Sequence, residues 1–223
     1  MNPPDTLYRL LSWLSPNYPV GAFSYSHGLE AAVEQGSVRD VASLTAWVET
    51  VLEHGTGQVD GTLFCEAWRA TDAQEWGRLQ DVRALGNAFL STGEFALEAR
   101  AQGDAFLRAT SAAWHADALD RLGGSAVYPV AVAVACAAHG VPMDSGLHAY
   151  LHAFAANLVS AGVRLIPLGQ TDGQRALAAL SDTVSRVHER AAAASPDDLG
   201  TSAPLLDLAS MQHETQYTRL FRS

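Results

Sequence analysis

Lysine is absent from the 223-residue sequence, so its 14 Lys and Arg positions are all arginine. The arginines are scattered along the chain, whereas attraction to nucleic-acid phosphate needs clustered cations. The 24 acidic residues bring the formal net charge to −10. This charge pattern argues against nucleic acid and against an anionic membrane as partners, and it suits a basic protein surface or a metal-loaded partner better.

Cysteine is nearly absent as well, since Cys65 and Cys136 are the only 2 in the chain and no CxxC pair occurs. The first residues lack the basic and apolar stretches of a secretion signal. The longest apolar run, Ala126–His139, is shorter than the roughly 20 residues of a membrane-spanning helix. We therefore expect a cytoplasmic protein with buried free thiols and no membrane segment.

Sustained strand-like alternation is also lacking, because the one strand-like run, Val163–Leu168, is interrupted by Pro167. Apolar residues make up 48% of the chain, and alanine, the strongest helix former, is common. No internal repeat or low-complexity linker divides the sequence. The pattern predicts an all-α fold, a single helical domain over residues 1–223 with about nine or ten helices.

Several helix boundaries follow from local chemistry. Asp40 is placed to cap a helix, and Asp72-Ala73-Gln74-Glu75 fits a capping box that would open another. Tyr128-Pro129 opens an Ala/Val-rich helix. Gly162 is predicted to end a helix, and the last long helix is predicted over Thr171–Ala193.

The motifs that resemble catalytic sites are incomplete. Ser24 and Ser26 lie close to His27 in the sequence, which suggests a hydrolase. The glycine pattern of a nucleophile elbow is missing, however, and no predicted strand precedes these serines. Asp197-Asp198 lacks the further carboxylates of a magnesium site, and Gly169–Gln174 lacks the lysine of a phosphate loop. We expect no enzyme activity and no cofactor. A hydrolase centred on Ser24 or Ser26 is kept as a rival hypothesis.

His148 and His152 lie four positions apart on a predicted helix, so they share a face and could hold a metal ion. No third ligand stands at a familiar spacing. His213-Glu214 is a weaker version of the same pattern. A nickel-binding metallochaperone that uses His148, His152 and perhaps His213 is therefore the alternative function, whereas interface histidines without metal are the simpler interpretation.

Two segments do not fit a plain division into core and solvated surface. Ser15–Glu30 is dense in aromatic, glycine and hydroxyl residues, which is typical of a shaped turn. The tail Met211–Ser223 ends with aromatic and arginine side chains, the types that dominate binding hot spots. A chain terminus, in contrast, is usually polar and frayed. We expect the tail, residues 211–223, to be an exposed segment that orders on a partner.

Three blocks in these regions resemble the UreF family of urease accessory proteins. Pro19–Glu30, with the sequence PVGAFSYSHGLE, is similar to the N-terminal signature of that family. Gly169–Gln174, GQTDGQ, resembles its Gly-Gln-Thr-x-Gly-Gln block, and Met211–Ser223, MQHETQYTRLFRS, resembles its C-terminus. The blocks occur in order and span nearly the full chain.

The resemblance implies a non-catalytic, all-helical protein that dimerises, binds UreD (also called UreH) and recruits the GTPase UreG. This assembly delivers nickel to the urease apoprotein, and UreF-type proteins have been likened to GTPase regulators. The same resemblance implies that Tyr217–Ser223 packs on UreD. It also implies that the Ser15–Glu30 turn and the Gln170–Arg175 block shape the dimer or the UreG-facing surface. The implied partner-binding residues are Tyr18, Phe23, Tyr25, His27, Glu30, Gln170, Asp172, Gln174, Arg175, Tyr217, Arg219, Leu220, Phe221 and Arg222.

Overall fold

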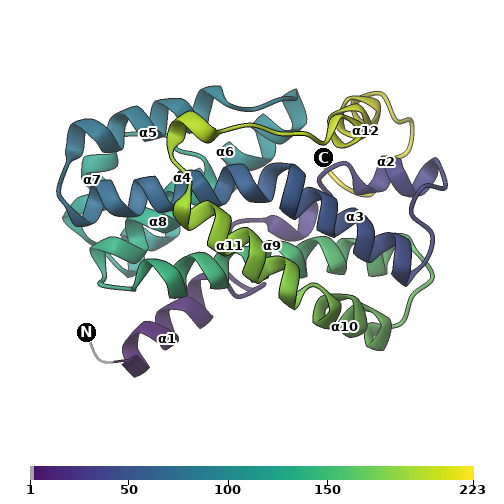
Figure 1. The fold of residues 1–223 in the computed structure, drawn as a ribbon, viewed down its shortest axis with the longest axis horizontal. Helices are drawn as coiled ribbons and strands as arrows, with labels where there is room; N and C mark the ends of the chain where they lie inside the picture. Colours follow the sequence, from purple (N-terminus) through teal and green to yellow (C-terminus); the bar gives the residue numbers. More distant parts are fainter. Residues whose placement is uncertain (1–2) are drawn as a thin grey trace.

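The computed structural model describes residues 3–223, and within them the chain forms twelve α-helices, two short 3-10 helices and no strand (Figure 1). The predicted all-α class is confirmed. In chain order the helices are α1 (Pro3–Trp13), η1 (Ala22–Ser24), α2 (Leu29–Glu34), α3 (Val41–His54), α4 (Thr56–Asp72), α5 (Trp76–Ala88), α6 (Gly93–Ala113), α7 (Asp117–Leu122), α8 (Tyr128–Ala138), α9 (Met143–Leu165), α10 (Gln170–Ala179), α11 (Ser181–Ala193), η2 (Pro196–Asp198) and α12 (Pro204–Glu214).

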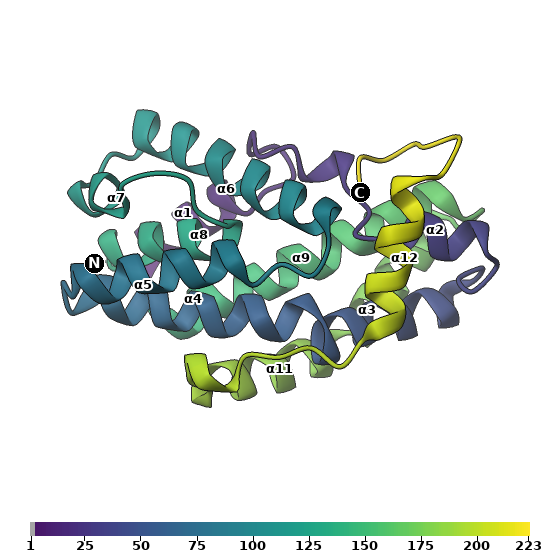
Figure 2. The ribbon, with the colours of Figure 1, turned by 90° about the horizontal axis from the view of Figure 1, so that it is seen from above.

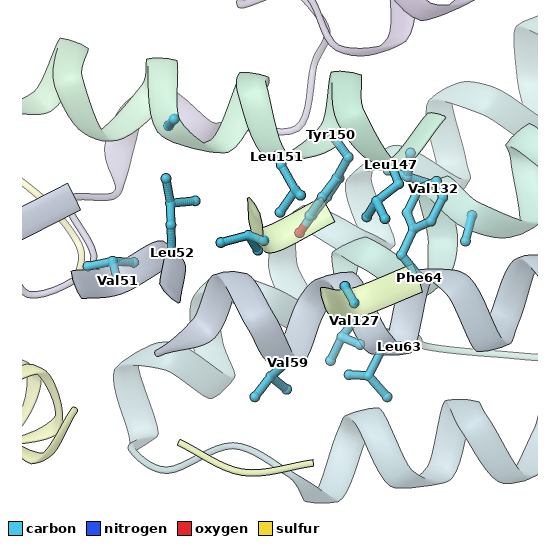
Figure 3. Close-up of a cluster of buried hydrophobic side chains, with 14 of the residues drawn as sticks. Val51, Leu52, Val59, Leu63, Phe64, Val127, Val132, Leu147, Tyr150 and Leu151 are labelled. Atoms are coloured by element: carbon cyan, nitrogen blue, oxygen red, sulfur yellow. The ribbon is translucent and has the colours of Figure 1, made fainter. Parts of the chain in front are cut away.

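Helix α8 is enclosed by other helices. Every residue from Pro129 to Cys136 is buried, because the helix is apolar on all sides and packs against α4, α6, α7 and α9. An all-round apolar surface is typical of a helix enclosed by others. Figure 3 shows part of this core, where Phe64 and Leu63 of α4 lie near Val132 and Val127.

A close approach between α6 and the start of α8 depends on Gly103. A Cβ atom at this position would lie 1.9 Å from the carbonyl oxygen of Ala126, so no larger residue fits without moving backbone. Gly103 is therefore a packing contact inside the continuous helix α6.

Some predicted boundaries are confirmed and others are wrong. Asp40 accepts a hydrogen bond from the Ser43 N–H at 2.8 Å and caps α3, as expected. The capping box at Asp72 does not form, because α4 continues through that residue. The stretch Thr171–Ala193 is two helices that meet at Leu180, and the short α7 was not predicted, which helps explain why the helices outnumber the estimate.

The longer helices run along the long axis of the molecule, and α2 and α12 lie together at one end (Figures 1 and 2). The C-terminus lies beside this pair, away from α5 and α7 at the other end. Within residues 3–223, no helix is both long enough and apolar enough to cross a membrane.

Candidate docking surface and the buried network beneath it

The N-terminal block forms a compact turn between α1 and α2. Gly21 and Gly28 both have positive φ, 76° and 77°, and His27 has φ 57°. A Cβ atom at Gly28 would lie 3.3 Å from the Ser210 backbone nitrogen of α12. Glycine at position 28 thus allows both the left-handed backbone and the close approach of α12.

The C-terminal tail folds back onto this turn. The Ser26 N–H and hydroxyl donate to the Ser223 carbonyl at 3.0 and 2.5 Å, although the two residues are 197 positions apart. The Arg222 N–H donates to the Ser24 carbonyl at 2.8 Å. Two segments that the sequence marked out separately therefore form one structural unit.

Glu30, on the first turn of α2, is the main acceptor for the tail. Its carboxylate accepts from the backbone N–H groups of Leu220 at 2.7 Å and Phe221 at 2.9 Å. It also lies 3.1 Å from Nε2 of His213. Because Glu30 is buried, these partners replace the water that a carboxylate would otherwise require.

His213 lies between two carboxylates and is fully buried. Its Nε2 faces Glu30, and its Nδ1 lies 2.8 Å from the nearer Glu94 oxygen. Arg219 is a further partner of Glu94, at 3.2 Å. Both ring nitrogens thus face carboxylate oxygens, one on α2 and one on α6, so His213 links the tail to these two helices.

A second pair supports the end of the chain. Glu98 accepts from the Ser223 hydroxyl at 2.7 Å and lies 3.2 Å from Nδ1 of His27. The other nitrogen of His27 is 2.7 Å from the Thr56 hydroxyl, and its ring stacks on Phe95 with centroids 4.0 Å apart. The network thus ties the turn before α2, the start of α4, helix α6 and the tail together.

The outer side of this unit is apolar and exposed. Phe23 is 64% exposed, Leu220 65% and Tyr217 fully exposed. Arg222 is also exposed and its guanidinium lies 5.6 Å from the Tyr25 ring centre. We call these four exposed side chains, Phe23, Tyr217, Leu220 and Arg222, the tail face.

Arg164, at the end of α9, packs against the inner side of the tail face. Its guanidinium carbon lies 3.6 Å from the ring centre of Phe23 and 4.4 Å from that of Phe221. Its Nη1 donates to the Phe23 carbonyl at 2.8 Å. Burial between the rings lowers the pKa of Arg164, and the two aromatic faces provide cation–π contacts there.

The tail therefore differs from the expected segment that orders only on a partner. Phe221 is 4% exposed and Ser223 is fully buried. Glu94 and Glu98 of α6, which accept hydrogen bonds from the tail, were not among the predicted site residues. Their spacing of four, beside the buried Phe95, is the signal that could have placed them on the inner face.

The predicted partner-binding residues divide into exposed and inner positions. Tyr25, His27, Glu30 and Phe221 are buried, and the last three make hydrogen bonds of the network. Tyr18 is half-buried, and its hydroxyl lies 2.8 Å from that of Thr110 of α6, away from the tail. The exposed ones are Phe23, Gln170, Gln174, Arg175, Tyr217, Arg219, Leu220 and Arg222.

The third block lies at the start of α10. Asp172 accepts from the Gly169 N–H at 3.4 Å and pairs with Arg175 at 2.8 Å, so its role here includes capping. Gln170 and Gln174 are exposed. Across residues 3–223, no hydrogen bond or ion pair links this block to the tail, and the two are separate surfaces.

The candidate metal ligands do not gather into a site in the described part of the chain. His148 and His152 of α9 line a groove with Leu7 and Leu11 of α1. His188 lies close by, with ring centroids 5.9 Å from His148, and burial lowers the pKa of His148. No group of three His, Cys, Asp or Glu side chains among residues 3–223 is arranged to hold a metal ion.

The hydrolase hypothesis finds no supporting geometry. The Ser26 hydroxyl is occupied by the Ser223 carbonyl, and the His27 nitrogens face Glu98 and Thr56. Asp198 caps the short η2 by accepting from the Ser195 N–H at 2.8 Å, which agrees with a helix start at Pro196.

Comparison with known proteins places these features in a family. A family model described as UreF matches residues 38–181. A urease accessory protein UreF from Granulibacter bethesdensis is 54% identical over 221 residues, which cover 97% of this chain and 94% of that protein. Proteins of the same name from Rhodopseudomonas palustris BisB5 and Bradyrhizobium diazoefficiens are 52% and 51% identical, over 98% and 97% of this chain and 91% of each relative. The relatives' matches extend over nearly the whole chain, beyond the range of the family model.

Proposed function

Since the chain belongs to the UreF family of urease accessory proteins, we propose that it is a non-catalytic scaffold for nickel insertion into urease. In this proposal it works in the cytoplasm, forms a homodimer, binds UreD and recruits UreG, whose GTPase activity it regulates. The assembly then acts on the urease apoprotein.

The tail face is the observation that carries the proposal. Aromatic and arginine side chains are the usual anchors of protein interfaces, and here Phe23, Tyr217, Leu220 and Arg222 are exposed on a rigidly held segment. Preorganisation lowers the entropic cost of binding, because the tail does not have to be ordered by the partner. We assign this face to UreD.

The α10 block is the proposed second surface. Gln170, Gln174 and Arg175 offer exposed polar groups at a place with no bond to the tail. A scaffold with three partners needs separate surfaces, so we assign this block to the dimer contact or to UreG. Both surfaces belong to one packed helical body.

Co-expression with UreD and UreG tests the proposal. We expect a complex of all three proteins whose size corresponds to two copies of each, and which supports nickel transfer to urease apoprotein. The substitution pair Tyr217→Ala and Leu220→Ala should remove UreD from the complex, whereas Gln174→Ala with Arg175→Ala should retain UreD.

Point substitutions test the role of the tail face more directly than deletion of the tail does. Deleting residues 215–223 would take hydrogen-bond partners from the buried Glu30, Glu94 and Glu98, so lost binding could reflect lost folding. Tyr217 and Leu220 are exposed, and their truncation leaves the network intact. Retention of UreD by that variant would refute the assignment of the tail face.

A further inference from the structure

A cavity of about 320 Å³ lies below the tail network, between α4, α5, α6, α8 and α9. Its volume is at the lower end of the range of small-molecule sites, which starts near 300 Å³. Nothing in the scaffold function described above requires such a space.

Most of the cavity wall is apolar. Phe89, Phe95 and Phe154 contribute aromatic rings from three separate segments. Val59 and Leu63 of α4 complete this part, and Figure 3 shows them close to Val127. An apolar wall of this kind suits a compact aromatic or aliphatic group.

One end of the cavity is polar and acidic. Asp60 of α4 and Glu98 of α6 both line it, together with His27. Tyr150 reaches from α9 toward α4 (Figure 3). Its hydroxyl donates to Asp60 at 2.6 Å. This is the one hydrogen bond that the Asp60 side chain makes within residues 3–223, so its other oxygen can accept from a ligand.

The electrostatics of this end favour a cationic group. No arginine lines the cavity, and the chain has no lysine, so two carboxyl groups face a single histidine. Burial raises the pKa of Asp60 to about 7, and nearby Glu98 adds to the rise while Tyr150 and His27 oppose it. A bound cation would offset this unfavourable burial of negative charge.

We propose that the cavity is a binding site for a small organic amine, with the ammonium group bonded to Asp60 and the body packed among Phe89, Phe95 and Phe154. The ammonium supplies charge-assisted hydrogen bonds to the acidic end, and the apolar body displaces weakly held water. A neutral ligand of the same shape would retain the packing of the apolar body and lack the charge-assisted hydrogen bonds.

The polar wall is shared with the anchor of the tail. Glu98 lines the cavity and also accepts from the Ser223 hydroxyl, and His27 contacts Glu98 from the same wall. A ligand at Asp60 therefore binds next to the groups that hold the end of the chain, so we expect its binding to alter the backbone amide signal of Ser223.

Isothermal titration calorimetry of the full-length chain with 2-phenylethylamine, 2-phenylethanol and 3-phenylpropionate tests the inference. We expect saturable binding of the amine, about tenfold or more weaker binding of the alcohol, and no binding of the carboxylate. Absence of saturable amine binding, or equal affinity for the alcohol or the carboxylate, would overturn the proposal.

Two variants locate the site. Asp60→Asn should remove the preference for the amine over the alcohol, and Ala99→Leu should abolish both by filling the cavity from α6. Circular dichroism establishes that each variant is folded, and amide chemical shifts of Ser223 in the wild-type chain report binding independently of either variant. Amine binding unchanged in both variants, or a Ser223 signal unaffected by saturating amine, would place the ligand elsewhere and refute the site.

This inference does not depend on the scaffold proposal. The calorimetry uses the chain alone, whereas the scaffold proposal is tested by complexes with UreD and UreG. Failure of either experiment leaves the other interpretable.

Discussion

Ser26 and Ser223 are joined by two hydrogen bonds across 197 positions of sequence, so the final residue of the chain is held by the turn that precedes α2. Beneath this junction, the carboxylates of Glu30, Glu94 and Glu98 are all buried. Each has backbone, hydroxyl, imidazole or guanidinium partners from the tail. The tail is thus part of the folded body, and only its outer side chains are available to a partner.

Glu30→Ala should release the tail. The substitution removes the acceptor of the Leu220 and Phe221 N–H groups and one partner of His213. We expect tryptic cleavage after Arg219 to accelerate by about tenfold or more, since proteolysis follows local opening. Mass spectrometry of timed digests measures it.

Glu34→Ala is the matched control, because Glu34 lies on the same helix but is exposed. Its tail should be cleaved at the wild-type rate. Equal cleavage rates for the two variants would show that Glu30 does not anchor the tail.

His213→Ala should strongly destabilise the fold. Without the imidazole, Glu30 and Glu94 each lose a buried hydrogen-bond partner, and an unsatisfied buried polar group typically costs about 1–3 kcal/mol, or more when it is charged. Urea unfolding measures the loss. The exposed His115→Ala should change stability by less than about 0.5 kcal/mol, and a similarly small loss at His213 would contradict the structural role.

Asp60 should make the stability of the protein fall as pH rises. Its folded-state pKa of about 7 lies above the ordinary value of 3.8, so the folded chain retains a proton that the unfolded chain has lost. This contribution is full below about pH 4 and disappears as pH rises through about 7. Free energies of unfolding at pH 5.5 and 8.5 should therefore differ less for Asp60→Asn than for the wild type.

The exposed Asp197→Asn serves as the control for this comparison. It should retain the wild-type dependence on pH. An Asp60→Asn variant with the same pH dependence as the wild type would show that the Asp60 proton does not contribute.

Two glycine substitutions in helices should have opposite effects. Gly103→Ala introduces a Cβ atom 1.9 Å from the Ala126 oxygen, and overpacking of this kind typically costs about 1–3 kcal/mol or more. At Gly77 a Cβ atom meets nothing within 4 Å, so Gly77→Ala should stabilise by about 0.5 kcal/mol. Thermal unfolding of both variants measures the difference, and a neutral Gly103→Ala would contradict the packing of α6.

The helical class and many elements could be predicted because they depend on local chemistry. Asp40 caps α3 by a hydrogen bond from the N–H of Ser43, three positions away in the sequence. The apolar run from Tyr128 forms α8, and its Pro129 and its alanines are local helix signals. Gly162 shows the limit of such reasoning. It was predicted to end a helix, but α9 continues to Leu165. Glycine is required there for packing, because a Cβ atom at position 162 would lie 2.5 Å from the Leu44 side chain of α3. A packing glycine and a terminating glycine look alike in sequence.

The candidate site was predictable in its parts and not in its assembly. Ser15–Glu30 and Met211–Ser223 each stood out through composition, yet nothing local indicates that Ser26 bonds Ser223. Glu94 and Glu98 were missed because their spacing beside Phe95 indicates the face of α6 on which they lie but not what covers that face. Their burial depends on donors from a segment more than 100 positions away.

The affinity for UreD of the Tyr217→Ala, Leu220→Ala double variant shows whether the tail face docks UreD, and the tryptic assay establishes that the tail of this variant remains anchored. We expect a loss of about 100-fold or more in affinity, the range expected when hot-spot side chains are truncated. We expect wild-type affinity for the Gln174→Ala, Arg175→Ala variant. Wild-type affinity of the tail variant, with its tail still anchored, would contradict the claim that this face docks UreD.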